Sequence, residues 1–248
     1  MKNLKGKYCI VTGAGKGIGK AIAQRFLEEE AAGVAILEWD LALAEATAKE
    51  LDSTGERVLA IRCNVADSDM VKAAVDQVVA KFGRVDVLIN NAGITRDKIF
   101  HKMTDDDWHS VIDVNLNGVY NLCKFVVPMM REQEGGSIVN ISSTSLMGNP
   151  GQANYAATKA ALQGFTRTMA KELGRKNVRM NNIAPGYIDT DMMRAVGEEI
   201  LGRMIKNIPA QRLGKPEELA AVAAFLASDD SSWVSGETIF VSGAGVLH

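Results

Sequence analysis

The stretch YCIVTGAGKGIGKAIAQRFLEEE, residues 8–30, decides the fold of this chain. A short apolar run, YCIVT, leads into TGAGKGIG, and an amphipathic stretch follows. A strand, a glycine-rich turn and a helix in this order are typical of a dinucleotide-binding βα unit. Its glycines let the backbone approach a pyrophosphate at the positive end of the helix. The spacing is T-G-x-x-x-G-x-G, which places glycines at Gly13, Gly15, Gly17 and Gly19, with Lys16 and Ile18 between them.

An acidic residue follows this turn at the distance that a dinucleotide requires. The next apolar run, VAIL at 34–37, is followed at once by Glu38, nineteen residues beyond Gly19. A carboxylate at the end of the second strand can accept hydrogen bonds from the ribose hydroxyls of adenosine. A glycine-rich stretch alone could be a tight turn without a ligand. Together, the two features favour nucleotide binding.

Short apolar runs recur along the chain and alternate with longer amphipathic stretches. Two later runs are VDVLI at 85–89 and SIVNI at 137–141. This alternation predicts βαβ units and a parallel sheet. No linker, repeat or low-complexity segment interrupts it, so we expect one α/β domain over residues 1–248. The fold class we predict is a single doubly wound, Rossmann-type parallel sheet with helices on both faces.

Two helix starts can also be predicted. Thr104 precedes three aspartates, and Pro216 precedes two glutamates. These residues place a cap and negative charge at the positive end of a helix. We therefore interpret the aspartates as part of a helix start and not as metal ligands.

The composition argues against several classes of protein. With 28 basic and 30 acidic residues the formal net charge is -2, which gives no support for binding nucleic acid or a membrane surface. An odd number of widely spaced cysteines is unlike a disulfide framework or a zinc site, so we expect reduced thiols and no metal. There is no apolar signal segment at the amino terminus, and no run approaches the ~18 apolar residues of a membrane span. We expect a cytoplasmic protein. The cysteines are Cys9, Cys63 and Cys123.

The stretch NYAATKAAL at 154–162 places Tyr155 and Lys159 four residues apart. On a helix such residues share one face. Reduction of a ketone by hydride builds negative charge on oxygen, which a phenol can protonate. A free phenol has a pKa of about 10, and a nearby ammonium would favour its ionised form. The pair could also be a buried tyrosine beside a solvated lysine, so the rest of the chain has to decide.

Further motifs occur in a fixed order: NNAG at 90–93, VNLNG at 114–118, serines after the run at 137–141, and PGYIDTDM at 185–192. With TGAGKGIG and the tyrosine-lysine pair, the chain resembles the short-chain dehydrogenase/reductase family over essentially its whole length. Within the family it is most similar to the reductases of 3-oxoacyl thioesters, linked to carrier protein or to CoA. The stretches that carry this likeness are NNAGITRD, GNPGQANYAATKAAL, APGYIDTDM and IPAQRLGKPEELA.

The resemblance implies a catalytic set. Tyr155 would be the proton donor, and Lys159 would hold the nicotinamide ribose. Asn115 would support a water that passes protons to the lysine. The family's spacing, thirteen residues before the tyrosine, favours Ser142 as the serine that binds the substrate oxygen. Counting from the preceding strand makes Ser143 possible, and either serine could simply stabilise a turn.

The resemblance also implies contacts with the cofactor beyond the glycine turn and Glu38. The residues expected to contact the adenine and its ribose are Asn64, Val65, Asn90, Asn91, Ala92 and Gly93. Those expected near the nicotinamide are Pro185, Gly186, Ile188 and Thr190, together with Tyr155 and Lys159.

Glu38 decides our expectation for the cofactor. A carboxylate at this position would repel a 2′-phosphate, so we expect NAD(H) in preference to NADP(H). NADP(H) stays possible because Lys16, within the glycine turn, could reach a phosphate.

The resemblance further implies a lid over the substrate at about 190–213 and a homotetramer. Methionines at 192, 193 and 204 would suit an acyl chain, although they could equally fill a core. A carrier-protein reductase needs a basic patch, to which Arg175 and Lys176 could contribute. The mixed charges of REQEGG at 131–136 leave open whether acyl carrier protein is a partner.

Two other functions are compatible with the sequence. The same chemistry could act on a steroid, a polyol or a cyclic ketone, and the shape of the lid would decide. The chain could also sense a dinucleotide without turnover, against which the complete Ser, Tyr, Lys and Asn set argues.

Overall fold

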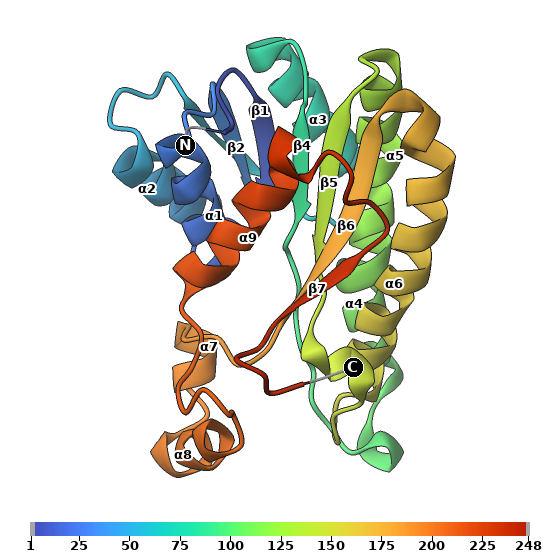
Figure 1. Cartoon of the computed structure of the whole chain (residues 1–248). Coiled ribbons are helices and arrows are strands. Elements are labelled where there is room, and N and C mark those ends of the chain that lie inside the picture. Colours follow the sequence, from blue (N-terminus) through green and yellow to red (C-terminus); the bar gives the residue numbers. More distant parts are fainter. Residues whose placement is uncertain (1–2, 247–248) are drawn as a thin grey trace.

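The computed structural model describes residues 3–246, apart from the side chain of Met192. Its strands form one parallel sheet in the order β3-β2-β1-β4-β5-β6-β7 (Figure 1). This confirms the predicted fold class. The strands are β1 (Tyr8–Thr12), β2 (Gly33–Glu38), β3 (Val58–Arg62), β4 (Val87–Asn90), β5 (Gly136–Ile141), β6 (Val178–Pro185) and β7 (Thr238–Val241).

Helices cover both faces of the sheet (Figure 1). One layer contains α1 (Gly17–Glu28), α2 (Leu41–Leu51) and α9 (Pro216–Ala227). The other contains α3 (Ser68–Phe82), α5 (Gly118–Glu132) and α6 (Ala153–Leu173), with α4 (Asp105–Ile112) packed against α6. Two short helices, α7 (Asp191–Arg194) and α8 (Glu198–Lys206), lie beyond the carboxyl ends of the strands. Among the described residues, no helix combines the length and apolar character needed to cross a membrane.

Successive side chains of each strand point to opposite faces of the sheet and pack into two separate hydrophobic cores. In β1, Cys9 and Val11 pack on the α1 and α9 side, whereas Ile10 packs on the α3 and α5 side. Because both faces are covered, the strands are continuous apolar runs. All three cysteines are buried free thiols, and burial raises the pKa of Cys63 to about 11.

The predicted helix starts are confirmed. Thr104 caps α4 by accepting a hydrogen bond from the backbone N–H of Asp107, whose carboxylate accepts one from the Thr104 N–H in return. Pro216 is the first residue of α9. One strand boundary was predicted wrongly, because β4 begins at Val87 and not at Val85. Asp86 instead binds the Tyr8 N–H through its carboxylate at 2.8 Å.

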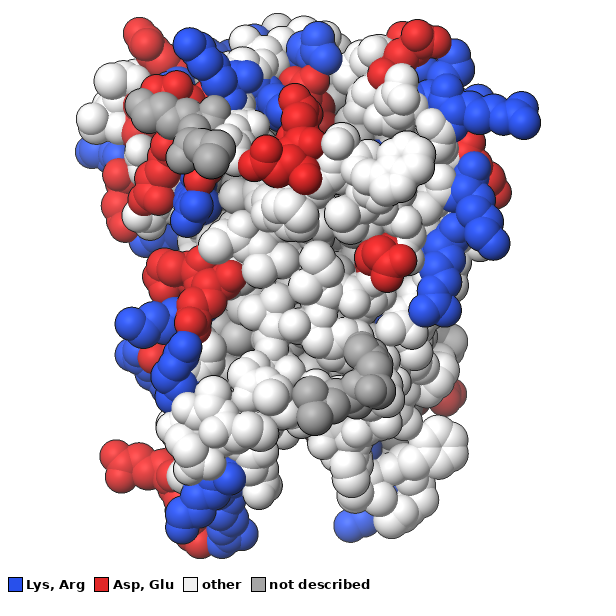
Figure 2. All heavy atoms as spheres, in the orientation of Figure 1, with Lys and Arg blue, Asp and Glu red and all other residues white. Residues whose placement is uncertain are grey.

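The order of the strands reverses beside β1, whose neighbours are β2 and β4. Loops from these strands diverge to opposite sides at the carboxyl edge, and ligands of open parallel sheets bind in the crevice that results. Figure 2 shows a hollow on this edge, between α8 and the segment around residue 100. The residues predicted to bind cofactor and substrate belong to this edge.

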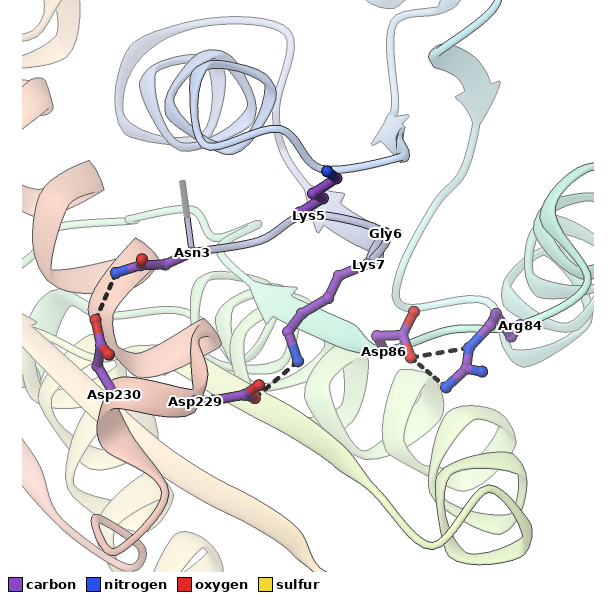
Figure 3. A pocket seen from close by; sticks show the side chains of 8 residues that line it. All are labelled: Asn3, Lys5, Gly6, Lys7, Arg84, Asp86, Asp229 and Asp230. Carbon is purple, nitrogen blue, oxygen red and sulfur yellow. Dashed lines mark hydrogen bonds and ion pairs between the residues drawn. The ribbon is translucent and has the colours of Figure 1, made fainter. Parts of the chain in front are cut away.

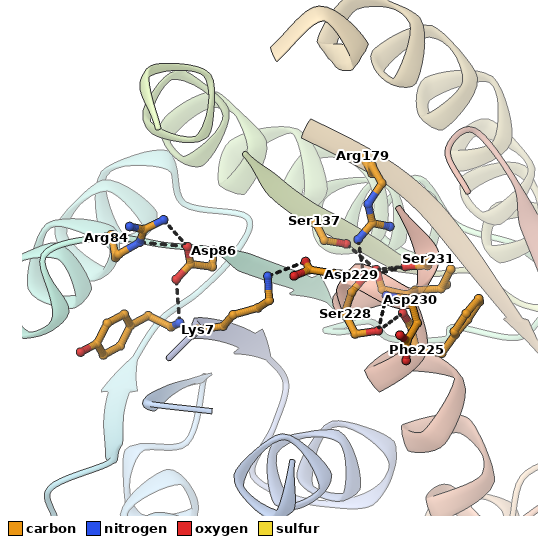
Figure 4. A network of polar contacts seen from close by, with 12 residues as sticks. Lys7, Arg84, Asp86, Ser137, Arg179, Phe225, Ser228, Asp229, Asp230 and Ser231 are labelled. Carbon is orange, nitrogen blue, oxygen red and sulfur yellow. Dashed lines mark hydrogen bonds and ion pairs between the residues drawn. The ribbon is translucent and has the colours of Figure 1, made fainter. Parts of the chain in front are cut away.

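The opposite, amino edge carries a polar pocket whose lining includes two ion pairs (Figure 3). Lys7 contacts Asp229 at 2.9 Å, and Arg84 contacts Asp86 at 2.6 Å. A wider network continues to Arg179, which donates a hydrogen bond to the carbonyl of Ser228 at 3.0 Å (Figure 4). These contacts connect segments at the amino ends of the strands. They lie at the edge of the sheet opposite the predicted cofactor and substrate site.

Candidate active site

The glycines of the turn are favoured for two reasons, positive φ angles at some positions and close packing at others. Gly13 and Gly17 have φ angles of 62° and 57°, which favour glycine. A Cβ atom at Gly19 would lie 2.3 Å from the Gly13 carbonyl oxygen and 2.6 Å from Asn91 Nδ2. At Gly15 it would lie 2.8 Å from Leu43 Cδ2. The turn therefore approaches its protein neighbours closely at Gly15 and Gly19.

The end of β4 holds the turn in place through hydrogen bonds. The hydroxyl of Thr12 accepts bonds from the backbone N–H groups of Asn91 and Ala92, at 2.9 and 3.0 Å. The Asn91 amide donates to the carbonyls of Thr12 and Gly13 at 2.9 and 3.0 Å. Asn90, by contrast, is buried and donates to Asn140 in the core. Of the two asparagines, Asn91 is the one that reaches the turn.

Glu38 also touches the turn. Its carboxylate accepts a hydrogen bond from the Gly15 N–H at 3.1 Å and one from the Trp39 N–H at 2.9 Å. A carboxylate has about four acceptor positions, so capacity remains for ribose hydroxyls. Lys16 is exposed and precedes α1, and Ile18 is half-buried within it.

Asn64 and Val65 follow β3 on the same edge. Asn64 accepts a hydrogen bond from the Ala66 N–H at 3.2 Å. Val65 packs onto Gly118, and its carbonyl accepts a bond from the Asn121 amide at 2.9 Å. The N–H of Cys63, the residue before Asn64, donates a hydrogen bond to the Glu38 carbonyl at 2.8 Å. This bond places the segment that contains Asn64 and Val65 beside the end of β2.

The segment after β6 returns to the glycine turn. A Cβ atom at Gly17 would lie 3.6 Å from Thr190 Cγ2, which puts Thr190 beside the start of α1. Pro185 ends β6, and the Gly186 N–H donates to the Val241 carbonyl at 3.0 Å. Ile188 is buried against Gly214.

Asn115 lies in a π-helical turn, Asp113–Asn117, between α4 and α5. Its side chain is fully buried and forms two bonds with the backbone of Ile94: its oxygen accepts from the N–H at 2.8 Å, and its nitrogen donates to the carbonyl at 2.9 Å. A Cβ atom at Gly93 would lie 3.3 Å from Asn115 Oδ1 and 3.7 Å from Lys159 Nζ. The structure thus brings Asn115, Gly93 and Lys159 together.

Lys159 is buried and its cation is not paired with a carboxylate in the described contacts. Its ammonium donates a hydrogen bond to the Ile141 carbonyl at 2.7 Å and lies 5.4 Å from the centre of the Tyr155 ring. Burial lowers the pKa of Lys159 to about 8. The predicted common face of Tyr155 and Lys159 is confirmed by this contact.

The electrostatic effect on Tyr155 differs from our expectation. We expected the lysine to lower the pKa of the phenol, but burial raises it. The Ser143 side chain, close enough for a hydrogen bond, lowers this pKa, and the negative charge of Asp97 raises it. With a pKa raised above the usual value of a phenol, Tyr155 is protonated at neutral pH.

The two candidate serines lie in different places. Ser142 is buried, and its hydroxyl donates to the Lys159 carbonyl at 3.0 Å, away from the open edge. Ser143 is half-buried, directly precedes the 3-10 helical turn Thr144–Met147 and interacts with Tyr155. Ser143 therefore interacts with the phenol of Tyr155, whereas the Ser142 hydroxyl binds the backbone of α6.

Sequence reasoning overlooked two residues of this edge, Asp97 and Gln152. Both belong to stretches that carried the family resemblance, ITRD and GQANY, but their side chains had no chemical motif to mark them. Within residues 3–246, no group of three or more His, Cys, Asp or Glu side chains is arranged to hold a metal ion.

A glycine turn at the switch point, an acidic residue at the end of β2 and a tyrosine-lysine pair define the class of a dinucleotide-binding oxidoreductase. Residues 13–245 match a family model described as enoyl-(acyl carrier protein) reductase. The chain belongs to the short-chain dehydrogenase/reductase family, whose members use a nicotinamide cofactor.

Several curated relatives span nearly the whole chain, and all three described here are 3-oxoacyl-(acyl-carrier-protein) reductases. That of Thermotoga maritima is 46% identical over 247 residues, covering 98% of this chain and 99% of the relative. That of Chlamydia muridarum is 44% identical over 242 residues, covering 97% of each chain. That of Staphylococcus epidermidis is 44% identical over 239 residues, covering 96% of this chain and 98% of the relative.

Proposed function

We propose that this chain interconverts 3-oxoacyl thioesters and their 3-hydroxyacyl forms by hydride transfer with a nicotinamide cofactor. The observation that carries the proposal is the cluster of Tyr155, Ser143 and Lys159 on the edge that also holds the glycine turn. The names of the relatives support the substrate class.

The residues present fit a dinucleotide. Beside Gly17 the backbone is open, because a Cβ atom there would meet only Thr190 Cγ2, at 3.6 Å. The N–H groups at the start of α1 can therefore face a pyrophosphate, to which the helix dipole also contributes. Glu38 would bind the adenosine ribose, and Lys159 the nicotinamide ribose. The remaining candidates are Gly13, Gly15, Asn64, Val65, Asn91, Ala92, Gly93, Gly186, Ile188 and Thr190.

When bound, the nicotinamide supplies the hydride for C3 of the substrate. Tyr155 then donates the phenolic proton to the oxygen that becomes the 3-hydroxyl. Ser143 holds that oxygen by a hydrogen bond as charge develops on it. Tyr155 is protonated at neutral pH, and burial raises its pKa further, so it carries the proton that the reductive direction needs.

Lys159 and Asn115 support the tyrosine. Below a pH of about 8 the buried ammonium of Lys159 is charged and stabilises the phenolate left after proton transfer. Asn115 fixes Ile94 and Gly93 beside Lys159 through its paired backbone bonds. We propose that this pocket holds the water through which Tyr155 regains its proton.

We also propose that NAD(H) is preferred to NADP(H). Glu38 is held at the glycine turn by the Gly15 N–H, so its negative charge lies where a 2′-phosphate would add two more. Lys16 is exposed and can turn into solvent. A carboxylate in a fixed position outweighs a mobile ammonium in deciding between the two cofactors.

Acyl carrier protein is the carrier we propose, because the relatives bear it in their names. Arg175 is exposed and offers a positive charge to an acidic partner. Lys176 is paired with Glu134 at 2.8 Å, which reduces its contribution. A CoA thioester is the alternative, and the two are compared in the assay below.

Three features of the wider molecule are proposed on the family resemblance. Residues 1–248 form one domain, and the segment of about 190–213, with α7 and α8, closes over the substrate. The side chains of Met193, Met204 and Ile205 are half-buried in this segment, and they suit an apolar acyl chain. We propose a homotetramer, which sedimentation or mass photometry would test.

The decisive experiment follows nicotinamide absorbance with acetoacetyl-CoA, a carrier-bound 3-oxoacyl group, and a panel of steroid, polyol and cyclic ketone substrates. We expect kcat/KM to be highest for a 3-oxoacyl thioester. Preference for an unrelated ketone would favour the alternative enzyme. Tight dinucleotide binding with no turnover on the whole panel would indicate a sensor.

A further inference from the structure

Asp97 lies at the entrance of the site and is fastened to the start of α6. The Gln152 amide donates a hydrogen bond to Asp97 Oδ2 at 2.8 Å. The next residue, Lys98, donates its backbone N–H to the Gly151 carbonyl at 2.8 Å. Gln152 is the residue directly before α6, and Tyr155 is the third residue of that helix. Two contacts thus hold the Asp97 carboxylate close to the catalytic tyrosine.

The same contacts connect Asp97 to the serine loop. Gln152 Oε1 accepts hydrogen bonds from the Ser145 hydroxyl at 2.9 Å and from the Asn149 amide at 2.8 Å. The Ser145 N–H in turn donates to the Ser143 hydroxyl at 3.1 Å. Asp97, Gln152 and Ser145 therefore form a continuous polar wall that ends at Ser143, beside Tyr155.

The charge of Asp97 is not cancelled within this wall, because its described partner is a neutral amide. The two neighbouring cations make their described contacts with other groups, and only the charge of Lys98 is neutralised there. Lys98 is paired with Asp107 at 2.7 Å, and the Arg96 guanidinium donates to the Thr95 carbonyl at 3.0 Å. The negative charge of Asp97 therefore lies beside the start of α6. The positive end of a helix dipole would otherwise favour a substrate anion at this position.

We propose that Asp97 makes this site select thioesters over free 3-oxo acids. A free 3-oxo acid carries a carboxylate at C1, two carbons from the ketone that Tyr155 protonates. That carboxylate would lie near Asp97 and be repelled, whereas a thioester has no charge at C1. This inference rests on the proposed function and adds that the acid is excluded by charge. Asp97 is thus a specificity-determining residue. The same charge raises the pKa of Tyr155, after burial as the larger cause.

The test uses the full chain with a neutral substrate, the N-acetylcysteamine thioester of acetoacetate, and measures acetoacetate as a competitive inhibitor. Asp97→Asn keeps an acceptor for Gln152 but removes the charge. We expect the inhibition constant of acetoacetate to fall by about three- to fifty-fold, which is the range for two charges about 7 Å apart between the dielectric of water and that of a protein surface. The KM for the thioester should stay within twofold. The effect should shrink at 0.5 M salt, because exposed charges are screened.

Two variants serve as controls. Asp97→Glu keeps the charge and should keep the inhibition constant. Glu45→Gln, an exposed position on α2, changes the net charge equally and should leave it unchanged. A further measurement is the pH profile of kcat/KM for the thioester. Its alkaline limb should move to lower pH in Asp97→Asn, because Asp97 raises the pKa of Tyr155.

An unchanged inhibition constant in Asp97→Asn, with thioester turnover intact, would overturn this inference alone. An equal change in Glu45→Gln would overturn it as well, since the effect would then be one of net charge. If the wild-type chain turned over no 3-oxoacyl thioester at all, the proposed function itself would fail.

Discussion

Lys159 Nζ lies 5.4 Å from the centre of the Tyr155 ring and donates its hydrogen bond to the carbonyl of Ile141 at 2.7 Å. The ammonium therefore faces the phenol while it is anchored to the end of β5. This arrangement separates two roles, proton donation by Tyr155 and charge stabilisation by Lys159. Substitutions at the two positions should have different consequences.

Tyr155→Phe should abolish most turnover and leave cofactor affinity nearly unchanged, because it removes the proton donor and little else. General acid catalysis contributes roughly 10²- to 10⁴-fold. Single-turnover rates and titration of NADH fluorescence would measure the two effects. Tyr120→Phe, at an exposed tyrosine of α5, is the matched control and should behave like wild type. A Tyr155→Phe rate above about a tenth of the wild-type rate, with chemistry limiting, would contradict the assignment.

Lys159 should make the stability of the protein depend on pH. Burial lowers its pKa from 10.5 to about 8, so between these values the unfolded chain binds more protons. The stability that belongs to this group is fully present above about pH 10.5 and is lost as the pH falls through about 8. Relative to Lys159→Met, the wild-type free energy of unfolding should rise by on the order of 3 kcal/mol from pH 7.5 to 10.5. Denaturant titrations across this pH range measure this difference between wild type and Lys159→Met. A difference that does not change with pH would contradict a buried lysine with a lowered pKa.

Much of this site follows from sequence because strand ends and helix faces fix side-chain positions. Glu38 ends β2 as predicted, and Tyr155 shares a face of α6 with Lys159. Positions that depend on loops were harder to place. Counting back from Tyr155 to the serine assumes a fixed loop length, whereas counting forward from β5 does not.

Other features could not be predicted because distant groups determine them. The π-helical turn that carries Asn115 occurs where its side chain binds the backbone of Ile94, twenty-one residues away. The start of β4 shifts because the Asp86 carboxylate takes the Tyr8 N–H. Likewise, no local sequence pattern predicts that the Lys159 ammonium donates a hydrogen bond to the carbonyl of Ile141.

The two serines give the next prediction. Ser143→Ala should lower kcat/KM by about 10- to 100-fold, the usual cost of losing a hydrogen bond to a developing charge. Ser142→Ala should mainly lower the free energy of unfolding, by about 1 to 3 kcal/mol, because it leaves the buried Lys159 carbonyl without the Ser142 hydroxyl. Steady-state kinetics and thermal unfolding of both variants would separate the roles. The reverse pattern would restore Ser142 as the catalytic serine.

Glu38→Ser should shift the cofactor preference toward NADPH. Two negative groups about 4 Å apart cost on the order of 1 to 4 kcal/mol at solvent-like to surface dielectric, so the ratio of kcat/KM values should change by about five-fold to nearly a thousand-fold. Affinity for both cofactors should also fall, because the turn loses the bond between Glu38 and the Gly15 N–H. Binding of 5′-AMP and of its 2′-phosphorylated form, measured by calorimetry, gives a readout without turnover. A wild-type preference for NADPH, or an unchanged ratio in the variant, would remove Glu38 as the determinant.

Gly19→Ala tests whether close packing of the glycine turn is needed for cofactor binding. A Cβ atom at this position would lie 2.3 Å from the Gly13 carbonyl oxygen, which is backbone and cannot rotate away, and 2.6 Å from Asn91 Nδ2. Overpacking of this kind typically costs about 1 to 3 kcal/mol, and here it would also displace the turn that faces the pyrophosphate. We expect lower thermal stability and at least a tenfold weaker NADH affinity. Gly164→Ala is the matched control, because Gly164 lies within α6 with nothing within 4 Å of the added Cβ, and alanine there should add up to about 1 kcal/mol of stability. If Gly19→Ala bound NADH as tightly as Gly164→Ala does, the glycine turn would not be the binding site of the pyrophosphate.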